Sequence, residues 1–257
     1  MKNLLLAASM LSLTAIAPSA FAQDDGIYPT SSIASVSEYV FRGVSLGGAS
    51  IQPSTEIGTS FGLTVGAWYS AGLGSDSDVQ ADEIDLYANY SVPFEGPFSV
   101  DIGGTYYHYP QSGSFFETED GAAGSYEFYG SVGLKNAPLS PVLTAYYDVT
   151  LENLTLEGAL VHNIDLPRPG WSADLGLTAG HVDSDQGVNY QWGTATIAAK
   201  KDVTDNIDFY ISGNFTLNSE DNTLGFDREV DTNSGIAFAT LDSDTQFWFG
   251  TGLSVSY

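Results

Sequence analysis

The chain ends in the segment Phe247-Trp248-Phe249-Gly250-Thr251-Gly252-Leu253-Ser254-Val255-Ser256-Tyr257, and this segment decides the fold. One parity carries Phe247, Phe249, Leu253, Val255 and Tyr257, whereas the other carries small or polar residues apart from Trp248. Alternation with a period of two predicts a β-strand. In a soluble protein, such an apolar last strand would be an exposed edge that invites aggregation. A closed barrel in lipid has no edge and an apolar outer face, so the segment predicts the terminal strand of an outer-membrane barrel.

The N-terminus has the features of an export signal. Lys2 precedes an apolar stretch from Leu4 to Ala17, and Ala20-Phe21-Ala22 has the small-x-small form of a cleavage site. The stretch of about fourteen residues is too short for a spanning helix. We therefore expect residues 1–22 to be a signal peptide cleaved after Ala22, and residues 23–257 to form one outer-membrane β-barrel. A retained membrane anchor is the alternative.

Composition limits the classes of partner and site. The chain has no cysteine, which excludes disulfides and thiolate metal sites. It carries 32 Asp and Glu against 7 Lys and Arg, and phosphate binding needs a basic surface, so nucleic acid is not an expected partner.

Alternating segments recur along the chain and predict an all-β fold, a transmembrane antiparallel up-and-down β-barrel of about twelve strands. Short turns rich in Pro, Gly or Lys alternate with acidic and mostly longer loops, although the turn near Asn153 is short. Short periplasmic turns and long outer loops are typical of such barrels, whereas a secreted β-sandwich has no reason to sort its loops. The terminal strand must then pair with the first. The predicted strands are 33–41, 51–59, 63–72, 83–92, 98–110, 126–134, 143–149, 153–160, 171–179, 190–199, 207–217 and 247–257; residues 237–241 could extend a strand above the membrane.

Aromatic residues lie mostly near the ends of these strands. Such positions form the aromatic girdles of membrane barrels, although ordinary strand propensity also favours aromatics. The girdle candidates include Tyr28, Tyr39, Phe41, Trp68, Tyr69, Tyr90, Phe98, Tyr147, Trp171, Phe209, Phe247 and Tyr257.

The polar parity of the strands is rich in carboxylates and should face the lumen. Burying these groups in a dry interior would be costly, so we expect a hydrated lumen that concentrates cations. This predicts an outer-membrane porin-like channel for passive diffusion of small solutes or ions. A non-conducting barrel with a structural, adhesive or surface-binding role through acidic outer loops is the alternative. The expected pore-lining residues are Glu38, Arg42, Glu56, Glu83, Asp85, Asp101, Glu127, Asp148, Glu157, Asp174 and Asp208.

Metal and enzyme sites have little support. Three Asp-Ser-Asp triplets fall in predicted outer loops and offer the weak metal candidates Asp76, Asp78, Asp183, Asp185, Asp242 and Asp244. None of them has the spacing of a calcium-binding loop, so an acidic rim is the simpler interpretation. No catalytic motif accompanies the three histidines, and we expect neither an enzyme nor a cofactor.

The segment Ser37-Glu38-Tyr39-Val40-Phe41-Arg42-Gly43-Val44-Ser45 resembles the S-x-Y-x-F-R-G-x-S signature of the TorF family of proteobacterial putative porins. Looser similarities are Gly66-Ala67-Trp68-Tyr69-Ser70, Tyr106-Tyr107-His108-Tyr109-Pro110, Tyr126-Glu127-Phe128-Tyr129 and Ala145-Tyr146-Tyr147-Asp148, whereas the acidic stretch 218–245 departs from it. The resemblance implies a barrel of porin type and supplies no solute. Physically, Gly43 permits a turn closed to other residues, and Arg42 would be a strong cation among carboxylates.

These features together predict the partners and the location. We expect the barrel in the outer membrane of a Gram-negative bacterium, in contact with the lipid bilayer and lipopolysaccharide. The terminal strand ending in Tyr257 should engage the barrel-assembly machinery, and small solutes or cations should occupy the lumen.

Overall fold

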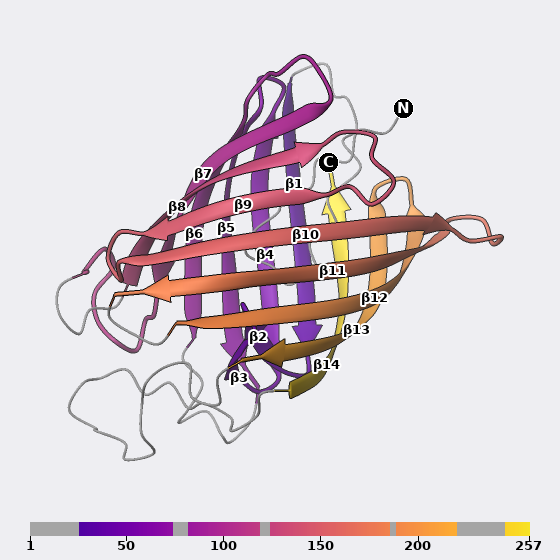
Figure 1. Cartoon of the computed structure of the whole chain (residues 1–257). Coiled ribbons are helices and arrows are strands. Elements are labelled where there is room, and N and C mark those ends of the chain that lie inside the picture. The colour runs from indigo at the N-terminus through magenta and orange to yellow at the C-terminus, as the bar shows by residue number, and fades with distance from the viewer. Residues whose placement is uncertain (1–25, 74–81, 119–123, 186–188, 220–244) are drawn as a thin grey trace.

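The computed structural model describes residues 26–73, 82–118, 124–185, 189–219 and 245–257 (Figure 1). Twelve antiparallel strands form one closed barrel in the order β1-β14-β13-β12-β11-β10-β9-β8-β7-β6-β5-β4, which confirms the predicted fold class. The described residues contain no helix that could span a membrane. The barrel strands are β1 (Ile27–Val36), β4 (Ser50–Thr59), β5 (Leu63–Gly72), β6 (Glu83–Ser91), β7 (Phe98–His108), β8 (Gly124–Leu134), β9 (Val142–Asp148), β10 (Asn153–Asp165), β11 (Trp171–Ser184), β12 (Tyr190–Thr204), β13 (Ile207–Asn218) and β14 (Thr245–Ser256).

The terminal strand closes the barrel, as its sequence predicts. β14 pairs with β13 on one side and with β1 on the other, and Leu253 lies opposite both Phe209 and Ile33. Every strand therefore has two neighbours, so the edge that would expose the apolar terminal strand does not exist.

The connections sort to the two ends of the barrel (Figure 1). The end where β1 begins and β14 finishes, here called the turn end, carries the connections 60–62, 92–97, 135–141, 166–170 and 205–206. The opposite end, here called the loop end, carries the connections after β1, β5, β7, β9, β11 and β13. β12 runs on to Thr204, beyond the predicted strand 190–199, so Lys200 lies on the strand. The possible strand at 237–241 falls outside the described residues.

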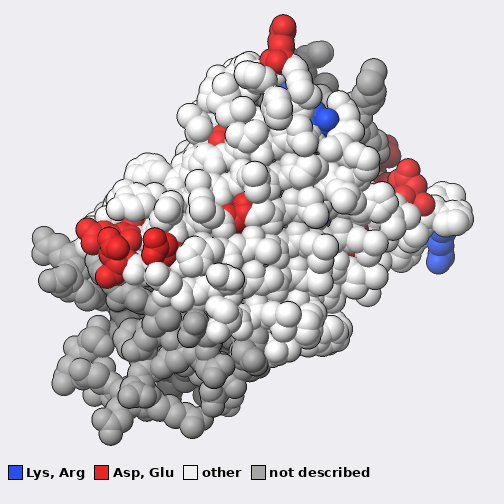
Figure 2. Space-filling view, viewed as in Figure 1, with Lys and Arg blue, Asp and Glu red and all other residues white. Residues whose placement is uncertain are grey.

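The outer face of the barrel is apolar. Along β14 the exposed apolar residues are Phe247, Phe249 and Leu253, whereas Trp248 and Ser254 are buried on the other face. Leu143 on β9 is 71% exposed and Ile197 on β12 is 61% exposed. An apolar surface this large would be unfavourable in contact with water. Figure 2 shows charged side chains mainly toward the two ends, with a broad and largely uncharged face between them. The lumen takes the polar parity, as the alternation predicts.

The first strand is shorter than its sequence suggests. β1 ends at Val36, and the next residues form a separate two-stranded hairpin of β2 (Tyr39–Phe41) and β3 (Val44–Gly47), so the expectation of one strand over 33–41 is wrong. Gly43 lies at a turn, as the sequence predicts, but β3 begins directly after it. The physical reason is that Tyr39, Val40 and Arg42 find partners inside the barrel, as described below, and these contacts outweigh the local alternation.

Candidate functional site

The β2–β3 hairpin lies inside the loop end of the barrel and crosses the lumen. Its side chains contact inward-facing residues of β6 and β8 on one wall, and of β12 and β14 on the other. The tip is made by Arg42 and Gly43, whose φ angles of 46° and 82° place both in the left-handed region. A Cβ atom at Gly43 would lie 2.3 Å from Cβ of Trp192, so the close approach of the tip to β12 also requires glycine.

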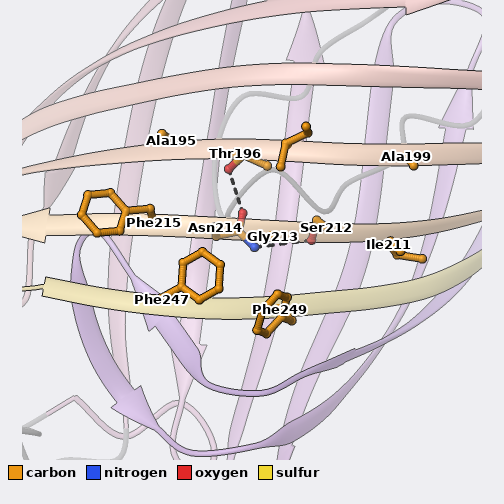
Figure 3. Close-up of a pocket in the computed structure, with 11 residues that line it drawn as sticks. Ala195, Thr196, Ala199, Ile211, Ser212, Gly213, Asn214, Phe215, Phe247 and Phe249 are labelled. Carbon is orange, nitrogen blue, oxygen red and sulfur yellow. Dashed lines mark hydrogen bonds between the residues drawn. The ribbon is translucent and has the colours of Figure 1, made fainter. Parts of the chain in front are cut away.

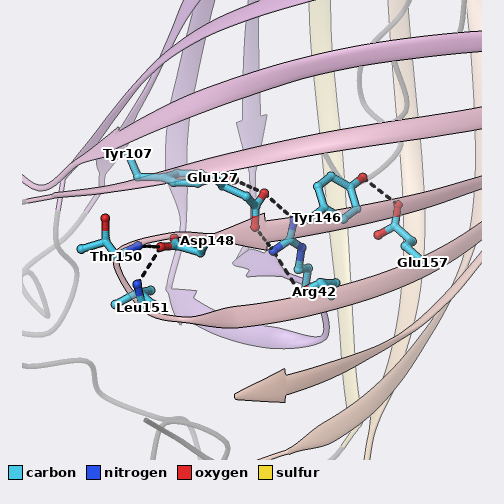
Figure 4. A network of polar contacts seen from close by, with 9 residues as sticks. Arg42, Tyr107, Glu127, Tyr146, Asp148, Thr150, Leu151 and Glu157 are labelled. Atoms are coloured by element: carbon cyan, nitrogen blue, oxygen red, sulfur yellow. Dashed lines mark hydrogen bonds and ion pairs between the residues drawn. The ribbon is translucent and has the colours of Figure 1, made fainter. Parts of the chain in front are cut away.

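Arg42 ties the hairpin to the acidic wall of the lumen (Figure 4). Its two terminal nitrogens donate to the two carboxylate oxygens of Glu127, each at 2.7 Å, in the bidentate geometry that suits a guanidinium. The guanidinium carbon lies 4.3 Å from the ring centre of Tyr146, a cation–π distance. Burial alone would lower the pKa of Arg42, but the charge and hydrogen bonds of Glu127 outweigh it and hold the pKa above its usual range.

Tyr39 forms a second polar tie between the hairpin and the same wall. Its hydroxyl donates to Oε2 of Glu83 at 2.8 Å, and Tyr109, which follows β7, donates to Oε1 at 3.4 Å. Burial, with the nearby carboxylates of Glu83 and Asp85, raises the pKa of Tyr39 and of Tyr109 well above the ordinary value. Both phenols therefore keep their protons and remain hydrogen-bond donors.

Tryptophans that face the lumen hold the apolar side of the hairpin. Val40 packs with Val36 and with Trp248, which is 1% exposed. The ring of Tyr39 lies 5.6 Å from that of Trp68, and Gly43 lies against Trp192. The prediction of an outward girdle position is therefore wrong for Tyr39, Phe41 and Trp68, because Tyr39 and Trp68 are buried around the hairpin and Phe41 lies in the hairpin against Tyr107.

The remaining positions of the S-x-Y-x-F-R-G-x-S segment also lie at this constriction. Phe249 donates its backbone N–H to Oγ of Ser37 at 2.9 Å, which fixes the base of the hairpin to β14. Phe41 lies edge-on to Tyr107 at 6.2 Å, and Ser45 is buried. Asn218 donates to the backbone oxygen of Gly43 at 3.2 Å. The segment is thus a folded element of the lumen.

The structure places most of the predicted pore-lining residues on the inner face of the barrel. Glu83, Asp85, Glu127 and Asp148 are buried near the hairpin, and Glu157 accepts a hydrogen bond from Tyr146. Glu38 is the exception, because it lies in the connection between β1 and β2 and not on the barrel wall.

Toward the turn end, the inner face is more open. Glu56 and Asp101 are half-buried and accept hydrogen bonds from Tyr87 and Ser91. Asp208, on the inward parity of β13, is also half-buried. Asp174 forms an ion pair with Lys200 and accepts a hydrogen bond from Asn163 at 2.5 Å. The hairpin therefore narrows one half of a lumen whose other half is lined by carboxylates.

Sequence reasoning missed the inward hairpin and the residues that hold it. One signal was present: Trp248 was the large apolar exception on the polar parity of the terminal strand. Trp68 and Trp192 likewise stand among inward-facing residues. A buried tryptophan facing a lumen needs an apolar partner there, and the hairpin supplies it.

The acidic loop triplets do not form a metal site in the part of the chain that the structure describes. No group of three or more His, Cys, Asp or Glu residues there is arranged to hold a metal ion. Asp183 accepts a hydrogen bond from Asn189 at 2.8 Å, whereas Asp76, Asp78, Asp242 and Asp244 lie outside the described residues.

A groove on the outside of the barrel lies over β12, β13 and β14 (Figure 3). Exposed Phe215, Phe247 and Phe249 line it together with Ile197 and Ile211, and Gly213 leaves space between them. Since this surface is apolar and belongs to the outer face, it suits a lipid acyl chain and is not a solute path.

Comparisons with known proteins agree with this architecture. Residues 22–246 match the model of a family described as "Bacterial protein of unknown function (Gcw_chp)". The fold is similar to that of the NanC porin (TM-score 0.55, 9% identity, 88% of this chain and 98% of that chain covered). It is also similar to that of the KdgM porin (TM-score 0.56, 10% identity, 89% and 99% covered) and of the KdgM porin in complex with disordered oligogalacturonate (TM-score 0.53, 10% identity, 90% and 99% covered). No curated protein sequence matches this chain. At these identities the structural likeness shows a porin-type fold alone.

Proposed function

This chain belongs to the Gcw_chp family, and we propose that it is an outer-membrane channel for the passive diffusion of small solutes or ions. One observation carries the proposal: a closed twelve-stranded barrel combines an apolar outer face with a lumen lined by carboxylates. A barrel of this size lies between eight-stranded barrels, which side chains fill, and the wide porins. The hairpin then acts as the constriction. Membership of the TorF porin family is part of the same proposal, supported by the Ser37–Ser45 segment.

The location follows from the same features. The apolar outer face suits lipid, and the predicted signal peptide, cleaved after Ala22, would direct the chain across the inner membrane. We therefore assign the turn end to the periplasm and the loop end to the outside, in contact with lipopolysaccharide. The terminal strand ending in Tyr257 would engage the barrel-assembly machinery. We propose no reaction and no cofactor for this activity.

The charge of the lumen favours cations. Among the described residues, the inward-facing cations are Arg42 and Lys200, and each is already paired with a carboxylate. Carboxylates of the described residues such as Glu56, which accepts a hydrogen bond from Tyr87 toward the turn end, would concentrate cations and repel anions. The KdgM porin has been solved in complex with oligogalacturonate, which is a polyanion. The acidic lumen of this chain does not suit such a solute, so we do not extend that ligand to it.

Single-channel recording in planar bilayers tests the proposal. The purified, refolded barrel should give discrete conductance steps, and a salt gradient should give a reversal potential of the sign expected for cations. Liposome swelling with neutral sugars of increasing size then measures the width of the constriction. A folded barrel that neither conducts nor permits swelling would exclude the channel and favour the non-conducting alternative, a structural, adhesive or surface-binding barrel with acidic outer loops.

A further inference from the structure

Two carboxyl groups under the hairpin lack a compensating positive charge. Glu83 and Asp85 occupy consecutive inward positions on β6 and are only 2% and 3% exposed. Alternate residues of a strand point to the same face, so the two carboxyl groups face the same part of the lumen. Arg42 is bound to Glu127 and Lys200 to Asp174, so the two lumen-facing cations of the described residues are both engaged elsewhere. Two neighbouring ionised carboxylates buried without a counter-charge repel each other, so a proton or a cation is needed to neutralise them.

Unpartnered polar atoms surround this pair. Oδ1 of Asp85 is buried without a hydrogen-bond partner, although a carboxylate oxygen is a strong acceptor. The cross-strand neighbours on β5 show the same feature: Ser70 lies opposite Glu83 and Trp68 opposite Asp85, and neither Oγ of Ser70 nor Nε1 of Trp68 has a partner. Buried polar groups are normally satisfied, so these atoms indicate a bound group: a cation would take the two oxygen atoms, and a water of its shell would accept from the N–H of Trp68.

We propose that Glu83 and Asp85 bind a divalent cation, with Ca²⁺ as the best match. Two carboxylates neutralise a charge of two, and Ca²⁺ takes carboxylate, hydroxyl and water oxygens in flexible geometry. The protein ligands are the two carboxylates and the hydroxyl oxygen of Ser70, and water completes the shell. Tyr39 and Tyr109, which donate to Glu83, form the outer layer of the site.

The site connects the cation to the hairpin. Tyr39 belongs to β2, so its hydrogen bond to Glu83 carries any change at the carboxylates to the constriction. A bound cation fixes Glu83 in place and removes the repulsion from Asp85, and both effects stabilise the docked hairpin. The proposal concerns binding and does not depend on whether the barrel conducts.

Terbium luminescence tests the site directly. Tb³⁺ replaces Ca²⁺ at oxygen sites, and Tyr39, Tyr109 and Trp68 lie close enough to sensitise its emission. The acidic residues 220–244 contain neither Tyr nor Trp, so binding to that stretch would contribute little to the signal. Folded barrel in detergent is titrated with Tb³⁺ and then with Ca²⁺, for the wild type, Glu83→Gln, Asp85→Asn and the control Asp101→Asn. Asp101 also faces the lumen, but it already accepts a hydrogen bond from Ser91.

The expected result is a saturable wild-type signal that Ca²⁺ displaces. Glu83→Gln and Asp85→Asn should weaken the apparent affinity at least tenfold, whereas Asp101→Asn should stay within twofold of the wild type. The amide variants remove repulsion, so they should fold, and heat-modifiable mobility on gels checks this. As a second measurement, Ca²⁺ should raise the unfolding temperature of the wild type more than that of Asp85→Asn, and EDTA should reverse the rise. Equal titrations of wild type and Asp85→Asn would overturn the proposal and leave a shared proton between the two carboxyl groups.

Discussion

Replacing Arg42 by alanine tests the role of the hairpin most directly. The substitution removes two hydrogen bonds of 2.7 Å and leaves Glu127, whose side chain is 3% exposed, without its ion-pair partner. Removing one partner of a buried ion pair typically costs about 3–5 kcal/mol. The lower end applies here, because Tyr107 still donates to Glu127 at 3.1 Å and the Arg42 side chain is itself 11% exposed. We therefore assign about 3 kcal/mol to the loss.

This free energy acts on the docking of the hairpin and not on the barrel. Arg42 lies outside the twelve paired strands, so the hydrogen bonds that close the barrel are untouched. Since about 1.4 kcal/mol is a factor of ten in an equilibrium constant, the undocked state should become about 100-fold more populated relative to the docked one. Single-channel recordings should show this as more frequent or longer visits to a higher conductance. Cation selectivity should also rise, because the lumen loses a positive charge.

Two companion variants separate charge from geometry. Arg42→Lys keeps the charge but not the bidentate fork, so it should lie between the wild type and Arg42→Ala. In the double variant Arg42→Ala, Glu127→Gln, no buried carboxylate loses its ion-pair partner, so much of the population with a docked hairpin should return. If Arg42→Ala folds, as judged by heat-modifiable mobility, and yet has the conductance, open probability and selectivity of the wild type, the hairpin is not the constriction.

Three further variants test other parts of the structure. Deleting Leu253 to Tyr257 removes the closing contacts of β14 with β1 and β13, so heat-modifiable mobility and outer-membrane fractionation should both be lost; a truncated chain recovered folded in the membrane would contradict this. Ile197→Arg places a charge midway along the outer face of β12 and should cost about 2–4 kcal/mol of folding free energy in lipid vesicles, measured by denaturant titration, whereas an unchanged midpoint would argue against lipid contact there. Trp248→Ala removes the partner of Val40 and should raise the mean conductance with a melting temperature close to that of the wild type; a normal conductance with a lowered melting temperature would assign Trp248 to the barrel wall alone.

The barrel could be predicted from the sequence because its rules are local. Successive residues of a strand point alternately to lipid and to the lumen, so the alternation along β14 predicts which residues lie on each face. Because its outward face is apolar, the strand also requires a sheet without a free edge. The partners of β14 follow from the closed up-and-down order, in which the last strand pairs with the one before it and with the first.

The hairpin could not be predicted in this way, because long-range contacts decide it. The residues 37–49 carry both alternation and glycines, and they are compatible with a longer strand that ends in an outer turn. What folds them inward is the match of Arg42 to Glu127, 85 residues away, and of Val40 to Trp248. Parity placed Glu127 and Trp248 correctly on the inner face, but it carries no information on which loop meets them.

The charge pattern of the lumen explains why the hairpin carries the arginine. The wall from β6 to β10 contributes Glu83, Asp85, Glu127, Asp148 and Glu157, whereas near the hairpin β12 to β14 contribute Trp192, Trp248 and neutral polar residues. Arg42 and Tyr39 meet the acidic wall, and Val40 and Gly43 meet the aromatic one.

Because the cation lies on the hairpin and not on the wall, docking narrows the lumen and neutralises part of its charge in one step. Undocking must then widen the path and make it more negative together. Conductance and cation selectivity should therefore rise in parallel across variants that loosen the hairpin. A variant such as Trp248→Ala, which changes no charge, should raise both. A higher conductance with unchanged selectivity would mean that Arg42 stays on Glu127 when the constriction opens.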